Sequence, residues 1–286
     1  MPVSESVPND TQTRLSNSGL RPAVDSSFDE WLSGQVVRNE KAFRGKPLLL
    51  DVGAYRGDFA SKFLGLKNTP FQKAVLFEPN PDCFRMLEGV FASDSRYSVQ
   101  RVACDSESNP RTLFCRGEKY TGSLLHYATE EGGFSTDETL VRCLRLDDYL
   151  TSSSDRAQVG LIKVDTQGND LRVLQGAEEI LRTSRPWLAV ELIFIPLYKG
   201  QADPQELTRW LGSQGYTLAG QFNEYYTSDG WLAWEDACFI PKEVPRSAAM
   251  DFVRRPVLVD AYQVSAPKRR QFLRSIFKRQ ASHGGN

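Results

Sequence analysis

The chain alternates between short apolar runs and longer segments in which apolar residues recur every three or four positions. The continuous apolar runs predict buried strands at 47–52, 73–78, 159–165 and 187–193. The periodic segments that follow them predict amphipathic helices at 58–66, 81–92, 170–183 and 204–214. Strands that alternate with helices in this way are typical of a mostly parallel sheet with helices on both faces.

Further elements complete an α/β fold of about seven strands. A third strand is expected at 97–103, and two more at 216–222 and around 233–240. Turn residues at Gly215 and at 228–230 indicate that the last strand runs antiparallel to its neighbours. Residues 106–146 interrupt the alternation with short strand candidates and Gly/Ser/Thr loops, and we expect this insertion to take part in substrate recognition.

Both ends of the chain differ from the domain between them, which we place at 25–243. Residues 1–24 are rich in Ser, Thr, Asn and Pro and are expected to be disordered, and a helix is expected at 28–43. The tail, 244–286, carries nine Lys and Arg against two Asp, and 268–280 predicts a basic amphipathic helix. Such a helix docks on a membrane surface or on a protein partner, or it packs on its own domain. Without an aromatic-interleaved basic groove, nucleic acid is not an expected partner.

Composition narrows the class of protein. A length of 286 residues with 40% hydrophobic and 25% charged residues fits one large globular domain. No apolar run is long enough to span a membrane, and the first twenty residues lack the apolar core of a secretory signal. The five cysteines are scattered and there are only two histidines, which argues against a zinc site and favours reduced thiols in the cytoplasm.

Candidate chemistry gathers where the first two strands end. The first strand ends in Asp51 and continues into a turn with Gly53 and Gly57, and the second strand ends in Glu78. Asp51 would repel the pyrophosphate of a dinucleotide, and the three-glycine fingerprint of a nicotinamide site is incomplete. A cofactor with a cationic head and a ribose but no phosphate, such as S-adenosylmethionine, fits better. An ordinary glycine turn and a nicotinamide oxidoreductase remain the alternatives.

Four stretches in the right order resemble the FkbM family of S-adenosylmethionine-dependent methyltransferases. They are Leu-Asp-Val-Gly-Ala at 50–54 with Gly57, Phe-Glu-Pro-Asn-Pro at 77–81, Ile-Lys-Val-Asp-Thr-Gln-Gly at 162–168, and Val-Glu at 190–191 followed by Pro-Leu-Tyr at 196–198. The segment 146–149 is also similar to that family. The resemblance covers roughly residues 45–240. It implies a Rossmann-like methyltransferase sheet of seven strands with a reversed last strand.

The resemblance also implies roles for individual residues. The cofactor-binding set comprises Asp51, Gly53, Ala54, Gly57, Glu78, Pro79 and Asp105. Asp51, Gly53 and Gly57 belong to the methionine end, Glu78 binds the ribose, and Asp105 or its neighbours lie by the adenine. Asp105 is also the third acid near a predicted strand end, although a plain loop residue explains it equally well. Asp165 is expected next to the transferred methyl group.

The implied reaction is O-methylation of a hydroxyl on a sugar, glycolipid or polyketide. Asp165 and Glu191 are the candidates for base or acceptor orientation, with Asp170 third. These carboxylates could also hold Mg²⁺, but Gln167 and Asp170 stand where the family often has Glu, which weakens that prediction. His126 is either a base or substrate contact, or an ordinary loop residue. A docking protein that binds the cofactor without turnover is the other alternative.

Overall fold

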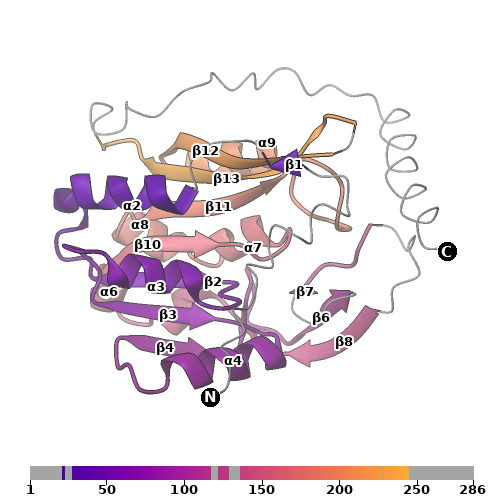
Figure 1. Ribbon diagram of the computed structural model, residues 1–286, viewed down its shortest axis with the longest axis horizontal. Coiled ribbons are helices and arrows are strands. Elements are labelled where there is room, and N and C mark those ends of the chain that lie inside the picture. The colour runs from indigo at the N-terminus through magenta and orange to yellow at the C-terminus, as the bar shows by residue number, and fades with distance from the viewer. Residues whose placement is uncertain (1–20, 23–27, 117–121, 129–135, 228, 245–286) are drawn as a thin grey trace, which may run out of the picture.

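The computed structural model describes residues 21–22, 28–116, 122–128, 136–227 and 229–244 (Figure 1). The expected disorder of 1–24 falls outside these ranges except at 21–22. The basic tail falls outside them except at Val244. The predictions made for both segments therefore stay predictions.

A central sheet of eight strands organises the described residues, in the order β1-β12-β13-β11-β10-β2-β3-β4. The bounds are β1 Arg21–Pro22, β2 Leu48–Val52, β3 Lys73–Phe77, β4 Tyr97–Gln100, β10 Val159–Val164, β11 Trp187–Ile193, β12 Tyr216–Tyr226 and β13 Leu232–Pro241. Strands β11, β10, β2, β3 and β4 are parallel to one another. The predicted mostly parallel sheet is confirmed, with the two-residue β1 added at its edge.

The reversed last strand lies inside the sheet. Strand β13 pairs antiparallel with β11 on one side and with β12 on the other. The strand order also changes direction at β2. The strands that follow it directly in the chain, β3 and β4, lie on one side of it, and the later strands β10 and β11 lie on the other. In open α/β sheets, ligands bind beyond the carboxyl ends of the strands at such a reversal. The topology therefore directs attention to the ends of β2 and β10.

Helices cover both faces of the sheet, as the pattern predicted (Figure 1). One face packs against α2 (Phe28–Arg38), the 3-10 helix η1 (Glu40–Phe43), α3 (Asp58–Gly65) and α4 (Pro81–Phe91). The other packs against α5 (Leu146–Tyr149), α7 (Asp170–Gln175), α8 (Glu178–Thr183) and α9 (Pro204–Ser213), while the short α6 (Ser153–Arg156) has no buried residue. The strand interiors that separate these layers are fully buried, as in Leu49 and Leu50 of β2. Burial of this apolar surface is what holds the layers together.

Three predicted elements are interrupted in the structure. The helix expected at 28–43 is divided at Asn39 into α2 and the 3-10 helix η1. The strand expected at 97–103 leaves the sheet after Gln100, and β5 (Ala103–Cys104) pairs instead with β9 (Cys143–Leu144). The helix expected at 170–183 is divided into α7 and α8 around Gly176. A Cβ on Gly176 would stand 2.1 Å from the backbone oxygen of Asp105, so the helix breaks where it meets the β5 segment. A local sequence pattern does not contain that contact.

The insertion forms a small sheet of its own beyond the ends of β3 and β4 (Figure 1). Strand β6 (Arg111–Arg116) lies between β7 (Gly122–Ser123) and β8 (Thr136–Val141). Its buried side, with Leu113, Leu124 and Val141, packs on Ala103 and Cys143. The insertion is thereby fixed to the carboxyl end of the main sheet.

Asp147 joins α5 to α8. Its two carboxylate oxygens accept the backbone N–H groups of Glu179 and Ile180, both at 3.0 Å, and its side chain is almost fully buried. Since an acceptor here satisfies free N–H groups at the start of α8, we expect Asp147→Ala to lower the free energy of unfolding by about 1–3 kcal/mol. Asp148→Ala is the control, because Asp148 is exposed. Equal urea midpoints for the two variants would contradict this assignment.

Candidate functional site

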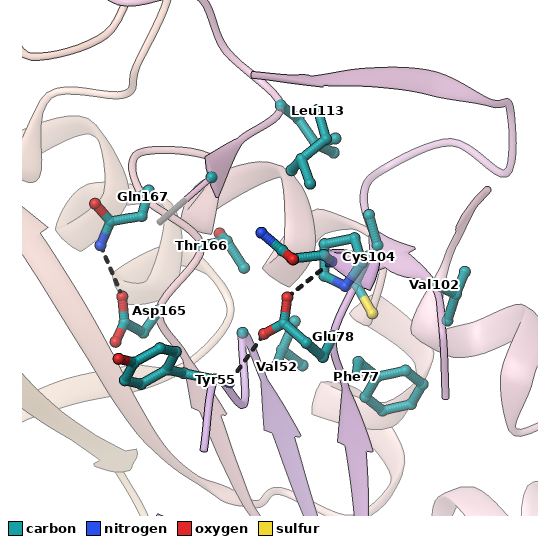
Figure 2. Close-up of a pocket in the computed structure, with 16 residues that line it drawn as sticks. Val52, Tyr55, Phe77, Glu78, Val102, Cys104, Leu113, Asp165, Thr166 and Gln167 are labelled. Carbon is teal, nitrogen blue, oxygen red and sulfur yellow. Dashed lines mark hydrogen bonds between the residues drawn. The ribbon is translucent and has the colours of Figure 1, made fainter. Parts of the chain in front are cut away.

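A cavity of about 200 Å³ opens at the carboxyl ends of the central strands (Figure 2). Its lining comes from the segments that follow β2, β3 and β10 and from the insertion: Val52, Gly53, Tyr55, Phe77, Glu78, Pro79, Asn80, Val102, Ala103, Cys104, Leu113, Gly122, Leu124, Asp165, Thr166 and Gln167. It lies at the reversal point of the strand order. This is where a doubly wound sheet binds its ligand.

Glu78 is the central acid of the cavity. One carboxylate oxygen accepts the backbone N–H of Tyr55 at 2.9 Å and the other accepts that of Asn80 at 2.9 Å (Figure 2). Tyr55 has φ +50°, a left-handed conformation that is uncommon outside glycine, and it directs this N–H at the carboxylate. Burial raises the pKa of Glu78 from 4.5 to about 7, against the lowering effect of the two N–H groups. Each oxygen keeps a further lone pair for a ligand hydroxyl.

One end of the cavity is apolar. Phe77 and Val102 form its floor, and Leu113 and Leu124 of the insertion form the opposite wall. Gly122 completes the wall, where a Cβ would stand 2.9 Å from Sγ of Cys115. The insertion predicted to recognise substrate thus contributes to the same cavity as Glu78. A flat, largely apolar group such as an adenine suits these surroundings.

The other end of the cavity is built on a buried lysine. Nζ of Lys163 donates to the backbone oxygen of Gly53 at 2.7 Å, and it lies 3.5 Å from Oδ1 of Asp51 and 3.4 Å from Oδ2 of Asp165. A Cβ on Gly53 would stand 1.9 Å from the backbone oxygen of Asp165, so the ends of β2 and β10 touch only because residue 53 is glycine. Burial lowers the pKa of Lys163, but the two carboxylates outweigh it and raise the pKa above its usual value.

Asp51 lies beneath the cavity and is fully buried, whereas 40% of the Asp165 side chain is exposed. Burial raises the pKa of Asp51, and Lys163 opposes that rise. Asp51 does not line the cavity. It reaches the site through Lys163, which it holds in place. Asp165 lines the cavity directly, as expected for a residue near the reacting group.

A chain of polar contacts continues from Asp165. Nε2 of Gln167 lies 3.2 Å from Oδ1 of Asp165 and 3.4 Å from Oε2 of Glu191, and the hydroxyl of Tyr198 donates to Oε1 of Gln167 at 2.8 Å. The structure thereby links the two predicted base candidates through a glutamine. Burial and then the negative charge of Asp165 raise the pKa of Glu191 well above its usual value.

Asp170 has a structural position. Its carboxylate accepts the backbone N–H groups of Thr166 at 3.0 Å and Gly168 at 3.1 Å, and it is almost fully buried outside the main cavity. Burial raises the pKa of Asp170 to about 7. The side chain shapes the turn that presents Asp165 and Gln167. Its position gives no support to the prediction that Asp170 is a base.

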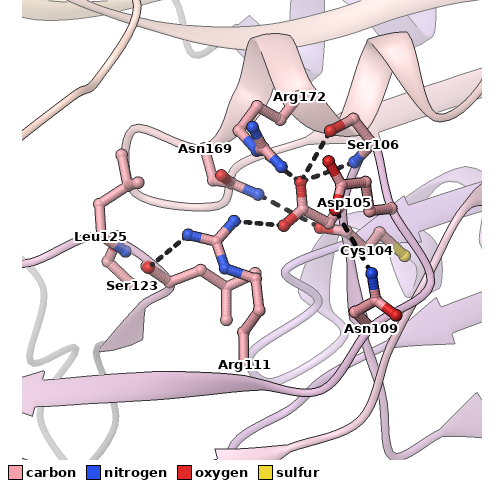
Figure 3. Close-up of polar contacts among 11 residues, drawn as sticks. Cys104, Asp105, Ser106, Asn109, Arg111, Ser123, Leu125, Asn169 and Arg172 are labelled. Carbon is pink, nitrogen blue, oxygen red and sulfur yellow. Dashed lines mark hydrogen bonds and ion pairs between the residues drawn. The ribbon is translucent and has the colours of Figure 1, made fainter.

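Asp105 lies outside the cavity, in contrast to the position predicted beside the adenine (Figure 3). Nε of Arg172 lies 2.6 Å from its Oδ1, and Arg111 forms an ion pair with its other oxygen. Burial raises the pKa of Asp105, but the two guanidinium groups outweigh it and lower the pKa below its usual value. The prediction placed Asp105 at a strand end of the main sheet, and the chain has already left that sheet. Cys104 and Ala103 take the place beside the apolar end of the cavity.

Four other predicted positions also lie away from the cavity. Glu191 is not among the lining residues and is joined to them through Gln167. Ala54 is buried in the core, and its backbone oxygen accepts the N–H of Gly57 at 2.7 Å. Gly57 has φ +76°, and a Cβ there would stand 2.5 Å from the ring of Phe91, so this glycine serves the turn and the packing of α4. His126 is exposed and its ring lies 3.8 Å from that of Phe114, centroid to centroid.

Comparisons with known proteins now decide the family. A sequence model described as the methyltransferase FkbM domain matches residues 51–218, which is more than half of the chain. The chain belongs to the FkbM methyltransferase family. The resemblance found in the motifs is confirmed. Comparison with curated proteins gives no match.

Several solved structures are similar to this chain at low identity. A crystal structure of methyltransferase FkbM from Methylobacillus flagellatus is 17% identical with a TM-score of 0.43, over 68% of this chain and 44% of that one. A putative RNA methyltransferase from Pyrococcus horikoshii is 11% identical with a TM-score of 0.41, over 82% of this chain and 99% of that one. A putative O-methyltransferase from Klebsiella pneumoniae is 12% identical with a TM-score of 0.40, over 83% and 91%. This chain spans less than half of the Methylobacillus flagellatus protein.

The cavity of this FkbM methyltransferase contains four of the predicted site residues, Gly53, Glu78, Pro79 and Asp165. Sequence reasoning missed Tyr55, Asn80, Cys104 and Gln167 as lining residues. Asn80 and Gln167 belong to the motifs that identified the family, so their position next to Glu78 and Asp165 was a signal that could have found them. Leu113 and Leu124 carry no such signal, because only the folding of the insertion brings them to the cavity.

Metal sites and membrane spans can be assessed only in the described part of the chain. No group of three or more His, Cys, Asp or Glu side chains there has the arrangement of a metal site, and the Mg²⁺ prediction gains no support. Within the same residues, no helix has the length and apolarity that a membrane span requires.

The lysine between the strand ends gives a prediction about stability. Lys163→Met leaves Asp51 buried without its cation, so we expect the free energy of unfolding to fall by about 3–5 kcal/mol. Lys73→Met is the matched control, because Lys73 is exposed on strand β3 of the same sheet. Urea denaturation measures both.

A double variant separates the lost charge pair from lost packing. If the unpaired carboxylate is the cause, Asp51→Asn combined with Lys163→Met is more stable than Lys163→Met alone. An equally unstable double variant would show that the ion pair is not what Lys163 provides.

Proposed function

We propose that this family member transfers methyl groups from S-adenosylmethionine, bound in the cavity around Glu78. The observation that carries the proposal is the geometry of that carboxylate, which is buried, held by two backbone N–H groups and open to the cavity. Such a carboxylate accepts hydrogen bonds from two neighbouring ribose hydroxyls. S-adenosylmethionine has no phosphate, so the cavity needs no phosphate-binding group. The acids of the cavity would repel a phosphate.

The rest of the cavity suits the two ends of the same cofactor. The adenine would lie between Phe77 and Val102 on one side and Leu113 and Leu124 on the other. The methionine end would lie against Gly53, Asp165 and Thr166, where carboxylates favour the positive charge of the amino group and the sulfonium. When bound, the cofactor supplies an electrophilic methyl group.

For the acceptor we propose a hydroxyl of a sugar, glycolipid or related small molecule. Methyl transfer to a hydroxyl requires an acceptor oxygen aligned with the methyl group and a base for its proton. Asp165 is the base candidate, because its carboxylate is 40% exposed and lines the cavity. Lys163 and Gln167 hold the two oxygens of Asp165.

Binding of S-adenosylhomocysteine, measured by calorimetry, tests the cofactor assignment. The ribose hydroxyls need the ionised form of Glu78, whose pKa is raised from 4.5 to about 7. Binding should therefore strengthen as the pH rises through about 7, with affinity about tenfold lower at about pH 6 than at about pH 8. Glu78→Gln should weaken binding by about tenfold or more and remove this pH dependence.

Glu235→Gln is the matched control, because Glu235 is another buried glutamate that lies outside the cavity. It should bind S-adenosylhomocysteine as the wild type does. A folded wild type that binds NADH but not S-adenosylhomocysteine would overturn the proposal in favour of an oxidoreductase.

Transfer of a tritiated methyl group from S-adenosylmethionine into extracts of polar lipids and glycans tests the acceptor class. We expect label in a product that is stable to mild alkali, as a methyl ether is and a methyl ester is not. Asp165→Asn should reduce transfer by about a hundredfold or more, the contribution of a general base, and weaken S-adenosylhomocysteine binding far less. Asp155→Asn, on the exposed helix α6, is the control. A wild type that binds the cofactor but labels no extract would favour a docking protein.

A further inference from the structure

Gln167 occupies an unusual position immediately above the end of β10. Its φ is +55°, a left-handed conformation that costs a non-glycine residue free energy and persists only where surrounding contacts impose it. Two contacts do so. The hydroxyl of Ser123, which is almost fully buried, donates to the backbone oxygen of Gln167 at 2.7 Å. The next residue, Gly168, lies so close to Tyr198 that a Cβ would stand 2.8 Å from the ring.

The orientation of the Gln167 carboxamide is fixed by a buried hydroxyl. Tyr198 is 5% exposed, and its hydroxyl lies 2.8 Å from Oε1 of Gln167. Burial raises the pKa of Tyr198 well above its usual value, so the phenol keeps its proton and is a donor. The partner of that donor must be the carbonyl oxygen. The amide NH₂ therefore faces the other way, toward the two carboxylates.

The NH₂ group has two hydrogens and two acceptors within reach. Nε2 lies 3.2 Å from Oδ1 of Asp165 and 3.4 Å from Oε2 of Glu191 (Figure 2 shows the first contact). These acids come from the neighbouring parallel strands β10 and β11. The neutral amide donates to both carboxylates without adding a charge, whereas Lys163 contacts only Asp165 of the two.

We infer that Gln167 is a positioning residue, which holds Asp165 at the polar end of the cavity by linking it to Glu191 through two hydrogen bonds. The inference rests on the proposed function, since it assigns the carboxylate of Asp165 to the place of the reacting group. Gln167 acts through Asp165 and Glu191, and Tyr198 acts through Gln167.

Two cofactor analogues measure the charge at that place. S-adenosylhomocysteine has a neutral thioether, and sinefungin has an ammonium-bearing carbon where the methylated sulfur would be. The ratio of their dissociation constants reports the negative charge around the methyl position, and binding of S-adenosylhomocysteine alone reports the integrity of the remaining cavity. Calorimetry of the full-length protein between about pH 6 and pH 9 gives the ratio and its pH midpoint.

Three variants change the amide in different ways. Gln167→Met keeps the length of the side chain and removes both polar ends, and we expect the preference for sinefungin to fall about fivefold or more. Tyr198→Phe removes only the hydroxyl that orients the amide, so the preference should fall in the same direction, by about threefold. Gln167→Glu places a third carboxylate against the pair, which should shift the pH midpoint of the preference upward by about one unit.

Gln158→Glu is the matched control for charge, because it makes the same substitution at an exposed residue before the opposite end of β10. It should leave the ratio and its midpoint unchanged. Its affinity for S-adenosylhomocysteine should stay within about twofold of the wild type, whereas in the three other variants the affinity for sinefungin should change more than the affinity for S-adenosylhomocysteine.

Each outcome either supports or overturns the inference about Gln167. An unchanged ratio and midpoint in the Gln167 variants would overturn the inference, as would an equal loss of both analogues, which indicates a merely structural role. If Gln167→Met does not fold, Tyr198→Phe and Gln167→Glu give the same test. A wild type that binds neither analogue would overturn the proposed function itself, and the inference with it.

Discussion

One buried cation holds the ends of the two central strands together. The ammonium group of Lys163 lies among the backbone oxygen of Gly53 and the carboxylates of Asp51 and Asp165, all within 3.5 Å. A charge in this position is stable only because its partners are in place, and its partners are stable only because of it. The turn after β2 and the turn after β10 therefore form one unit. Everything else in the cavity is arranged around that unit.

The cavity divides into two ends with different physical characters. At the apolar end, side chains of the insertion close over the strand ends, and shape decides what fits. At the polar end, Asp165 lines the cavity, and Glu191 of the neighbouring strand is joined to it through Gln167 without lining the cavity. Burial raises the pKa of Glu191 and the pKa of Glu78. Such perturbed acids are typical of functional sites, although structural networks such as that of Asp105 also contain them. In this protein, an acid of the functional site is distinguished from an acid of a structural network by its position in the cavity more than by its burial.

The acids at the strand ends show how far sequence reasoning reaches. A carboxylate directly after an apolar run predicts a polar group at the carboxyl edge of the sheet, and this holds for Asp51, Glu78 and Asp165. The pattern does not say which way the side chain points. Asp51 faces the core below the turn, Glu78 faces the cavity, and Asp105 belongs to a segment that has left the sheet. Alternation along a strand predicts the face of the sheet on which a side chain lies, but the path of the next turn decides whether the side chain faces the cavity.

The sequence by itself determined the class of fold, the order of its elements, the family and the location of the glycine turn after the first central strand, because these depend on local periodicity and on short motifs. Only the tertiary structure decided that β13 lies between β11 and β12, that α7 and α8 are separate, and that Leu113 and Leu124 reach the cavity. Only the tertiary structure joined Gln167 to Tyr198 and Glu191. The reason is physical. These features depend on contacts between residues far apart in the chain, and such contacts leave no trace in the spacing of neighbouring residues.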